Sequence, residues 1–97
     1  MSKADNHEIG GYHLNHKQHS ALEKVYAHPV AHNLTWHEVR TLLDAIGEVE
    51  EKHNGSWRIT VGGQVEVFDP NHGKDLTVEQ VMDLRRMLTA AGLEISA

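Results

Sequence analysis

Histidine is the residue type that decides what chemistry this chain could carry out. The 97 residues include nine histidines and no cysteine, which excludes disulfides and thiolate metal sites and leaves imidazole as the group that titrates near neutral pH. His53 lies beside Lys52 and across a predicted turn from Arg58. A cation there could hold a phosphate while the imidazole takes the proton of a ribose 2′-hydroxyl. His53 is therefore a candidate catalytic residue, although we favour the plainer interpretation of an exposed histidine beside an Asn-Gly turn.

His72 is the second candidate catalytic residue. It lies in a segment dense in turn-forming residues, 70–75, and together with Lys74 it could contact a phosphate. A loop histidine without a role fits the sequence equally well.

Three further histidines, His13, His16 and His19, are spaced three residues apart. On one face of a helix they could hold a metal ion, but no carboxylate pattern accompanies them and they fall in or beside a polar segment without periodicity. We therefore predict solvated imidazoles, with no metal site and no cofactor. Residues 1–17 are interpreted as a flexible tail.

Residues 48–69 predict a sheet of three antiparallel strands. Two turn signals, Asn-Gly at 54–55 and Gly-Gly at 62–63, separate β-branched runs that alternate between apolar and polar residues. A loop of three residues at each turn brings the apolar side chains to one face, whereas a two-residue loop at 62–63 mixes polar with apolar on both faces. We therefore predict three-residue loops.

The predicted register decides which face each aromatic side chain occupies. Trp57 lies on the core face opposite His53, and core burial is favoured over a role as a stacking platform for bases. The same face carries Ile59, Val61, Val65 and Val67. Phe68 and Arg58 point to the other face, so Phe68 is the better candidate for stacking on a base or contacting a partner.

Capping boxes predict the starts of three helices. The boxes are Ser20 with Glu23, Thr35 with Glu38, and Thr77 with Gln80. The first helix is short and covers 20–28, because the next residue is Pro29. The second covers 36–46, and the last ends at Gly92.

The predicted element order is short helix, helix, three strands, helix. Both long helices carry an apolar stripe that one face of the sheet could cover, which predicts an α+β two-layer sandwich with the order α-β-β-β-α after the short N-terminal helix. Residues 18–97 are expected to form a single domain, with its core between 34 and 93.

The formal net charge of −5 excludes a protein that coats nucleic acid without specificity, because such binding depends on neutralising many phosphates. Any contact with RNA would be local. The candidate RNA-binding residues are Lys52, Arg58, Phe68, Lys74, Arg85 and Arg86. Arg85 and Arg86 follow Asp83 in a helix, and a solvated face is the alternative that we favour for them. Without a membrane span or a signal-peptide core, the expected protein is cytoplasmic and does not associate with membranes.

Local patterns between residues 34 and 93 resemble the HicA family of toxin ribonucleases. In chain order they are Leu42-Leu43, Gly47, Gly55-Ser56-Trp57, His72-Gly73-Lys74-Asp75-Leu76, Leu84-Arg85-Arg86-Met87-Leu88 and Ala91-Gly92-Leu93. The resemblance implies the double-stranded-RNA-binding-domain-like fold, RNA as a ligand and a HicB-like antitoxin protein as a partner.

The chain departs from the family's pattern at the catalytic histidine. Family members carry Gly-Ser-His where this chain has Gly55-Ser56-Trp57, and an indole cannot exchange a proton near neutral pH. The toxins are also usually basic, whereas this chain is acidic. The resemblance therefore implies a HicA-like RNA-binding domain, which is either a toxin ribonuclease or a degenerate form of one, and it leaves open whether the chain is an enzyme. The alternative is a non-enzymatic module that keeps the fold and binds a protein.

Overall fold

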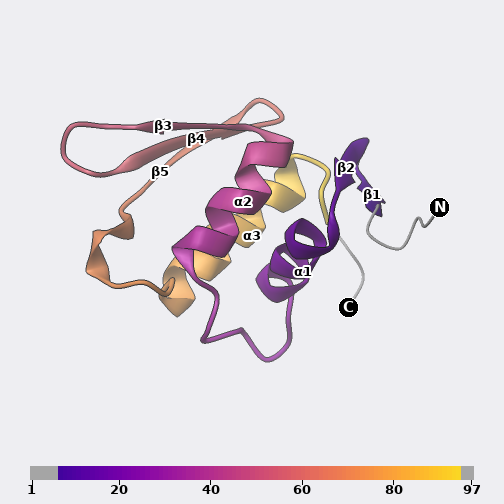
Figure 1. The fold of residues 1–97 in the computed structure, drawn as a ribbon, viewed down its shortest axis with the longest axis horizontal. Coiled ribbons are helices and arrows are strands. Elements are labelled where there is room, and N and C mark those ends of the chain that lie inside the picture. The colour runs from indigo at the N-terminus through magenta and orange to yellow at the C-terminus, as the bar shows by residue number, and fades with distance from the viewer. Residues whose placement is uncertain (1–6, 95–97) are drawn as a thin grey trace.

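The chain folds into a layer of strands and a layer of helices (Figure 1). The sheet is antiparallel and holds β3 (Glu48–Glu51), β4 (Trp57–Val61) and β5 (Gln64–Phe68) in the order β3-β4-β5. Helices α2 (Trp36–Ile46) and α3 (Val78–Ala90) cover one face of it and leave the other face open. This computed structural model describes residues 7–94. The predicted α+β architecture with a three-stranded antiparallel sheet is confirmed.

The two long helices begin where their capping boxes predict. At the start of α2, the backbone N–H of Glu38 donates to Thr35 Oγ1 at 3.1 Å and the N–H of Thr35 donates to Glu38 Oε1 at 3.0 Å. Thr77 and Gln80 exchange the same two bonds at the start of α3, at 3.1 and 2.9 Å. Each pair satisfies two backbone donors that the first helical turn cannot satisfy itself.

The first helix differs from its prediction. Helix α1 spans His16–Val25, and its N-cap is Asn15. Asn15 and Gln18 form the capping box with two bonds of 2.8 Å, so Ser20 lies inside the helix instead of starting it. The prediction of a helix over 20–28 was wrong because an equally good cap lies five residues earlier.

The interpretation of residues 1–17 as a tail without regular structure was also wrong for the part that the structure describes. β1 (His7–Ile9) and β2 (Tyr12–Leu14) form an antiparallel hairpin, visible beside α1 in Figure 1. Leu14 is fully buried, and a Cβ at Gly10 would lie 2.8 Å from the carbonyl oxygen of Gly92. The hairpin therefore packs against the end of α3. Residues 1–6 lie outside the described part of the chain.

The register of the sheet corrects the predicted loops. Val61 pairs with Gln64 across a two-residue loop, in which Gly62 and Gly63 have φ values of 53° and 85°. Positive φ at both positions gives the loop whose twist matches a β-hairpin, and glycine adopts it without steric cost. Trp57 lies opposite Phe68 and Glu51, not opposite His53, which belongs to the β3–β4 turn.

The consequence is that β5 turns its valines outward. Phe68 is buried with 5% of its surface exposed, whereas Val65 and Val67 are 47% and 60% exposed. The prediction that all apolar side chains of the strands share one face was wrong for β5, because β5 lies at the edge of the sheet. At such an edge Glu66 remains in solvent even though it alternates onto the covered face with Phe68.

One apolar core joins all these elements. Its fully buried side chains come from the hairpin, from each helix and from β4. They include Leu14, Leu22, Leu34, Leu42, Leu43, Ile59, Leu84, Leu88 and Leu93.

Candidate functional site

The β3–β4 turn contacts the segment that follows β5. The side-chain N–H of Asn71 donates to Asp69 Oδ1 at 2.8 Å and to the carbonyl oxygen of Asn54 at 3.5 Å. Gly55 has a φ of 90°, and a Cβ there would lie 2.6 Å from Asn71 Nδ2. A glycine at 55 is therefore required for the close approach of the two loops. This contact brings together the two chain segments that carry the candidate histidines.

His53 and Lys52 are exposed in the β3–β4 turn. They line a shallow hollow together with Glu50 and Glu51, whose carboxylates oppose the positive charge of Lys52. Among the described residues His53 has no hydrogen-bond partner or ion pair. A general base is normally oriented by a second group, so the surroundings of His53 fit the plainer interpretation of an exposed histidine.

His72 ends a short 3-10 helix, η1 (Pro70–His72), that Asp69 caps by accepting the backbone N–H of Asn71 at 3.0 Å. Lys74 is exposed, and its carbonyl oxygen accepts the N–H of Trp36 at 2.9 Å. This loop is therefore tied at one end to the β3–β4 turn, through the side chain of Asn71, and at the other end to the start of α2, through the carbonyl oxygen of Lys74.

Arg58 and Phe68 do not share a face, contrary to the prediction. Arg58 lies on the open face of the sheet, with Nη1 3.9 Å from Glu50 Oε1. Phe68 lies on the covered face, where its ring centroid is 6.0 Å from that of Trp36. Phe68 was predicted to stack on a base because it was expected to be exposed. The register set by the two-residue loop places it on the covered face instead.

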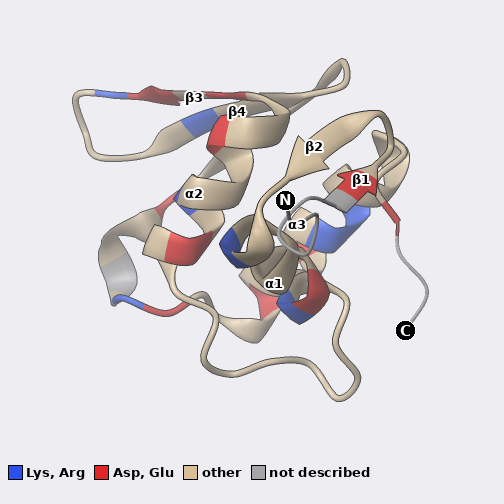
Figure 2. Cartoon of the chain, turned by 45° about the vertical axis from the view of Figure 1, so that its right-hand side comes forward, with Lys and Arg blue, Asp and Glu red and all other residues tan. Residues whose placement is uncertain are grey.

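Arg85 and Arg86 differ in their surroundings. Arg85 Nε donates to the carbonyl oxygen of Val25 at 2.9 Å, and its Nη2 donates to that of Ala27 at 3.1 Å. Arg85 thus satisfies carbonyl groups at the end of α1. Arg86 is exposed and pairs with Asp83 at 3.0 Å. Figure 2 shows Lys and Arg scattered over separate elements, so no single basic face is formed in the described residues.

Trp57 lies on the face of the sheet that the helices cover, as predicted. Its ring packs edge-on against Trp36, with centroids 5.4 Å apart, and the Arg40 guanidinium lies 5.4 Å from its centroid. Arg40 also donates to Glu51 Oε2 at 2.6 Å and to Asp44 Oδ1 at 3.1 Å. The bond to Glu51, followed by that to Asp44, raises the pKa of Arg40. This cluster explains how Glu51 is accommodated on the covered face.

Sequence analysis missed Arg40 as a partner of this sheet. Its spacing of four from Asp44 was the available signal, but that spacing indicates a helix-surface pair and says nothing about Trp57 or Glu51.

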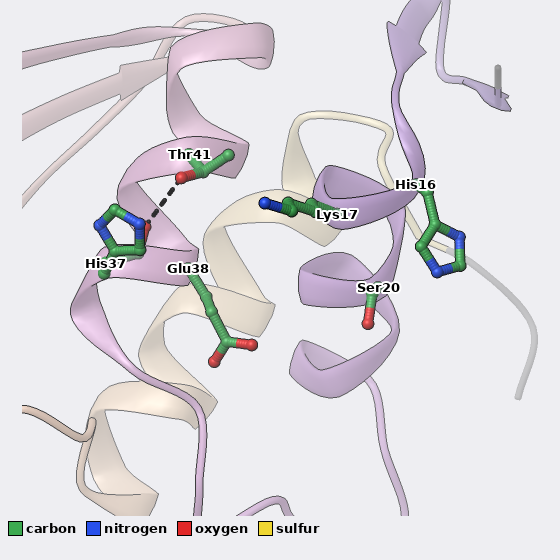
Figure 3. Close-up of a pocket in the computed structure, with 6 residues that line it drawn as sticks. All are labelled: His16, Lys17, Ser20, His37, Glu38 and Thr41. Atoms are coloured by element: carbon green, nitrogen blue, oxygen red, sulfur yellow. Dashed lines mark hydrogen bonds between the residues drawn. The ribbon is translucent and has the colours of Figure 1, made fainter. Parts of the chain in front are cut away.

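A groove between α1 and α2 was also missed, because its α1 side was interpreted as tail. Its volume is about 320 Å³, and it is lined by His16, Lys17, Ser20, His37, Glu38 and Thr41. Figure 3 shows Lys17 extending from α1 toward α2, while His16 points away from α2. Thr41 Oγ1 donates to the carbonyl oxygen of His37 at 3.0 Å.

The charge of Glu38 in this groove is compensated. Lys24 Nζ lies 2.8 Å from Glu38 Oε2. Burial raises the pKa of Glu38, but the hydrogen bonds from Lys24 and from the backbone and side chain of Thr35 outweigh it, and the net pKa is lowered. Glu38 therefore serves the capping box and the α1–α2 contact, and Lys17 is the groove's remaining cation.

Among the described residues between 7 and 94, no group of three or more His, Asp or Glu side chains could hold a metal ion. His13 lies on β2, apart from His16 and His19 on α1. Over the same residues, no helix has the length and apolar character that crossing a membrane requires.

The fold defines a class of protein: a two-layer α+β domain with one sheet face open, extended by an N-terminal hairpin and helix. No family model, no curated protein and no solved structure matches this chain.

Proposed function

We propose that this chain is a HicA-like domain that binds RNA without cleaving it. The observation that carries the proposal is the contact between the β3–β4 turn and η1, in which Gly55 meets Asn71. The two loops that carry the candidate catalytic histidines are adjacent there. Lys52 and Lys74 supply positive charge on the two loops, and His53 and His72 belong to the same two segments.

The absence of cleavage follows from the side chain at 57. In the family's pattern a histidine at this position transfers the proton, and indole has no group that titrates near neutral pH. Trp57 is held by Trp36 and Arg40 on the covered face of the sheet. His53 is the nearest alternative base along the chain, and it lacks an orienting partner among the described residues.

Binding through these loops should be weak and local. On single strands, the logarithm of the binding constant falls by about 0.7 per contacted phosphate for each tenfold rise in salt, and two lysines contact few phosphates.

The test is a fluorescence-polarisation titration of a short single-stranded RNA at two salt concentrations, since binding that depends on phosphate contacts weakens as the salt concentration rises. Lys52→Gln should weaken binding. The matched control is Arg86→Gln, which removes the same charge from α3 and should leave binding unchanged. The RNA should be recovered intact on a gel.

Three results would contradict the proposal. Cleavage of the RNA would show that the protein is a ribonuclease. Comparing the activities of His53→Ala and His72→Ala would then identify the general base. Equal losses for the two charge variants would indicate a diffuse surface instead of the loop site. No binding under any condition would remove RNA as a ligand.

A second candidate function is that of a non-enzymatic module that binds a protein, such as a HicB-like antitoxin. The open edge of β5, with Val65 and Val67 exposed, favours it.

A further inference from the structure

β5 is an edge strand with unpaired backbone groups. Val61 and Gln64 flank a two-residue loop and therefore exchange backbone hydrogen bonds with each other, and such pairs recur at every second residue. Glu66 and Phe68 consequently direct their N–H and C=O groups to β4. Val65 and Val67 direct theirs away from the sheet. No other described backbone group bonds to them.

The valine side chains are exposed on the open face of the sheet, directly beside these backbone groups. Natural edge strands are usually protected by charged side chains, proline or a bulge. β3, the opposite edge, is protected in this way by Glu48, Glu50 and Glu51, and Figure 2 shows it as an almost continuous acidic strand. β5 carries one charge, Glu66, and is therefore the edge that can accept another strand.

The charge around β5 differs between its two sides: on the open face Arg58 pairs with Val67, whereas the side that faces the helical layer is acidic. Glu66 is exposed on the side of β5 that faces the helical layer. On α3, which lies under the sheet, Glu79 and Asp83 are exposed and spaced four apart, so they share one side of the helix. That side differs from the side of Arg85, which contacts α1. Arg86 compensates Asp83, and the whole chain carries a net charge of −5.

We propose that β5 binds an extended, basic segment of a partner protein by strand addition. The segment's backbone would bond to the N–H and C=O groups of Val65 and Val67, and its apolar side chains would cover the two valines. Its alternate side chains, lysine or arginine, would face Glu66. This inference deepens the second candidate function by naming the partner's chemistry, and it does not depend on RNA binding.

A second copy of this chain is a poorer occupant. Antiparallel pairing of two β5 strands that uses all four outward groups sets Val65 opposite Val67 of the other copy. That register sets the two Glu66 side chains directly opposite each other, and like charges in this position destabilise a strand pair.

The test uses a fluorescein-labelled peptide of alternating lysine and valine and measures its binding to the full chain by polarisation. Val65→Pro removes an outward N–H without removing a bond to β4, because that N–H points away from the sheet. Without this N–H, the peptide loses one backbone hydrogen bond and one of its carbonyl oxygens is left without a donor. Binding of the peptide should therefore weaken about tenfold. Val65→Thr keeps the N–H and the β-branched shape, and should bind within about twofold of the unchanged chain, since it leaves the backbone bond in place.

Two peptide controls separate strand addition from general attraction to an acidic protein. The same peptide with N-methyl groups on alternate amides keeps its charge but cannot pair, and it should not bind the unchanged chain. A peptide with glutamate in place of lysine should not bind either, and Glu66→Gln should weaken the lysine peptide.

Binding of the N-methylated peptide, or equal binding to Val65→Pro and Val65→Thr, would overturn the proposal. A dimer of the chain alone in sedimentation, with its dissociation favoured by Val65→Pro, would overturn it in favour of a second copy. Lys52→Gln should leave peptide binding unchanged and Val65→Pro should leave RNA binding unchanged, so failure of one function is distinguished from failure of the other.

Discussion

Arg85 and Arg86 are neighbours in the sequence, but they make contacts of two different kinds in the structure. The guanidinium of Arg85 bonds to the carbonyl oxygens of Val25 and Ala27, sixty and fifty-eight residues away, and lies 5.9 Å from the ring of Tyr26. Arg86 makes an exposed ion pair with Asp83 within its own helix. The two residues carry the same charge, but only Arg85 joins α3 to α1.

We predict that Arg85→Ala lowers the free energy of unfolding by about 1–3 kcal/mol, because it leaves two partly buried carbonyl groups without their donor. Arg86→Ala, the matched control, should change it by less than about 1 kcal/mol, as expected for an exposed ion pair. Urea denaturation monitored by circular dichroism measures both. Equal effects of the two substitutions would show that the bonds of Arg85 contribute nothing to stability.

At the scale of elements, the start of α1 is where sequence and structure differ most clearly. Ser20 with Glu23 and Asn15 with Gln18 have the same capping pattern, and the chain uses the second. The helix therefore begins earlier than predicted, and it contributes Ala21, Leu22 and Val25 to the core.

We predict that Asn15→Ala lowers the free energy of unfolding by about 0.5–2 kcal/mol, the usual loss on removing an N-cap. Ser20→Ala should leave it unchanged or slightly raised, because alanine favours a helix interior. Thermal unfolding of both variants provides the comparison. If Ser20→Ala were the more damaging change, the helix would begin at residue 20 as the sequence suggested.

For the whole molecule, the N-terminal hairpin extends the core beyond the predicted range of residues 34–93. Leu14 is fully buried, Ile9 and Tyr12 pack against the core, and the turn at Gly10 approaches the end of α3. The last residues of the core, including Leu93, are therefore covered by the first described ones.

We predict that Leu14→Ala destabilises the protein by about 2–5 kcal/mol, the range for a large-to-small change in a packed core. Met82→Ala is the control: Met82 is 38% exposed on α3, and its truncation should cost much less. The measurement is again urea denaturation. A loss for Leu14→Ala no larger than for Met82→Ala would mean that the hairpin is not part of the cooperative unit.

The sequence by itself determined the features that depend on short-range bonds. Thr35 with Glu38 and Thr77 with Gln80 bond within three residues, so the starts of α2 and α3 followed from residue types and spacing. The three strands followed from two glycine-containing turns, and the α+β order followed from these elements. The two histidine loops were named from the sequence, although their contact was not.

The tertiary structure alone decided which face of each strand is buried and which charges have partners. The register depended on β5 being an edge, where a glutamate can alternate onto the covered face and stay in solvent. Arg40 meets Glu51 and Arg85 meets the end of α1 only because elements distant in sequence pack together. Burial is a property of the assembled layers, so local spacing could not predict Phe68 inside, Val67 outside, or a hairpin in the first fourteen residues.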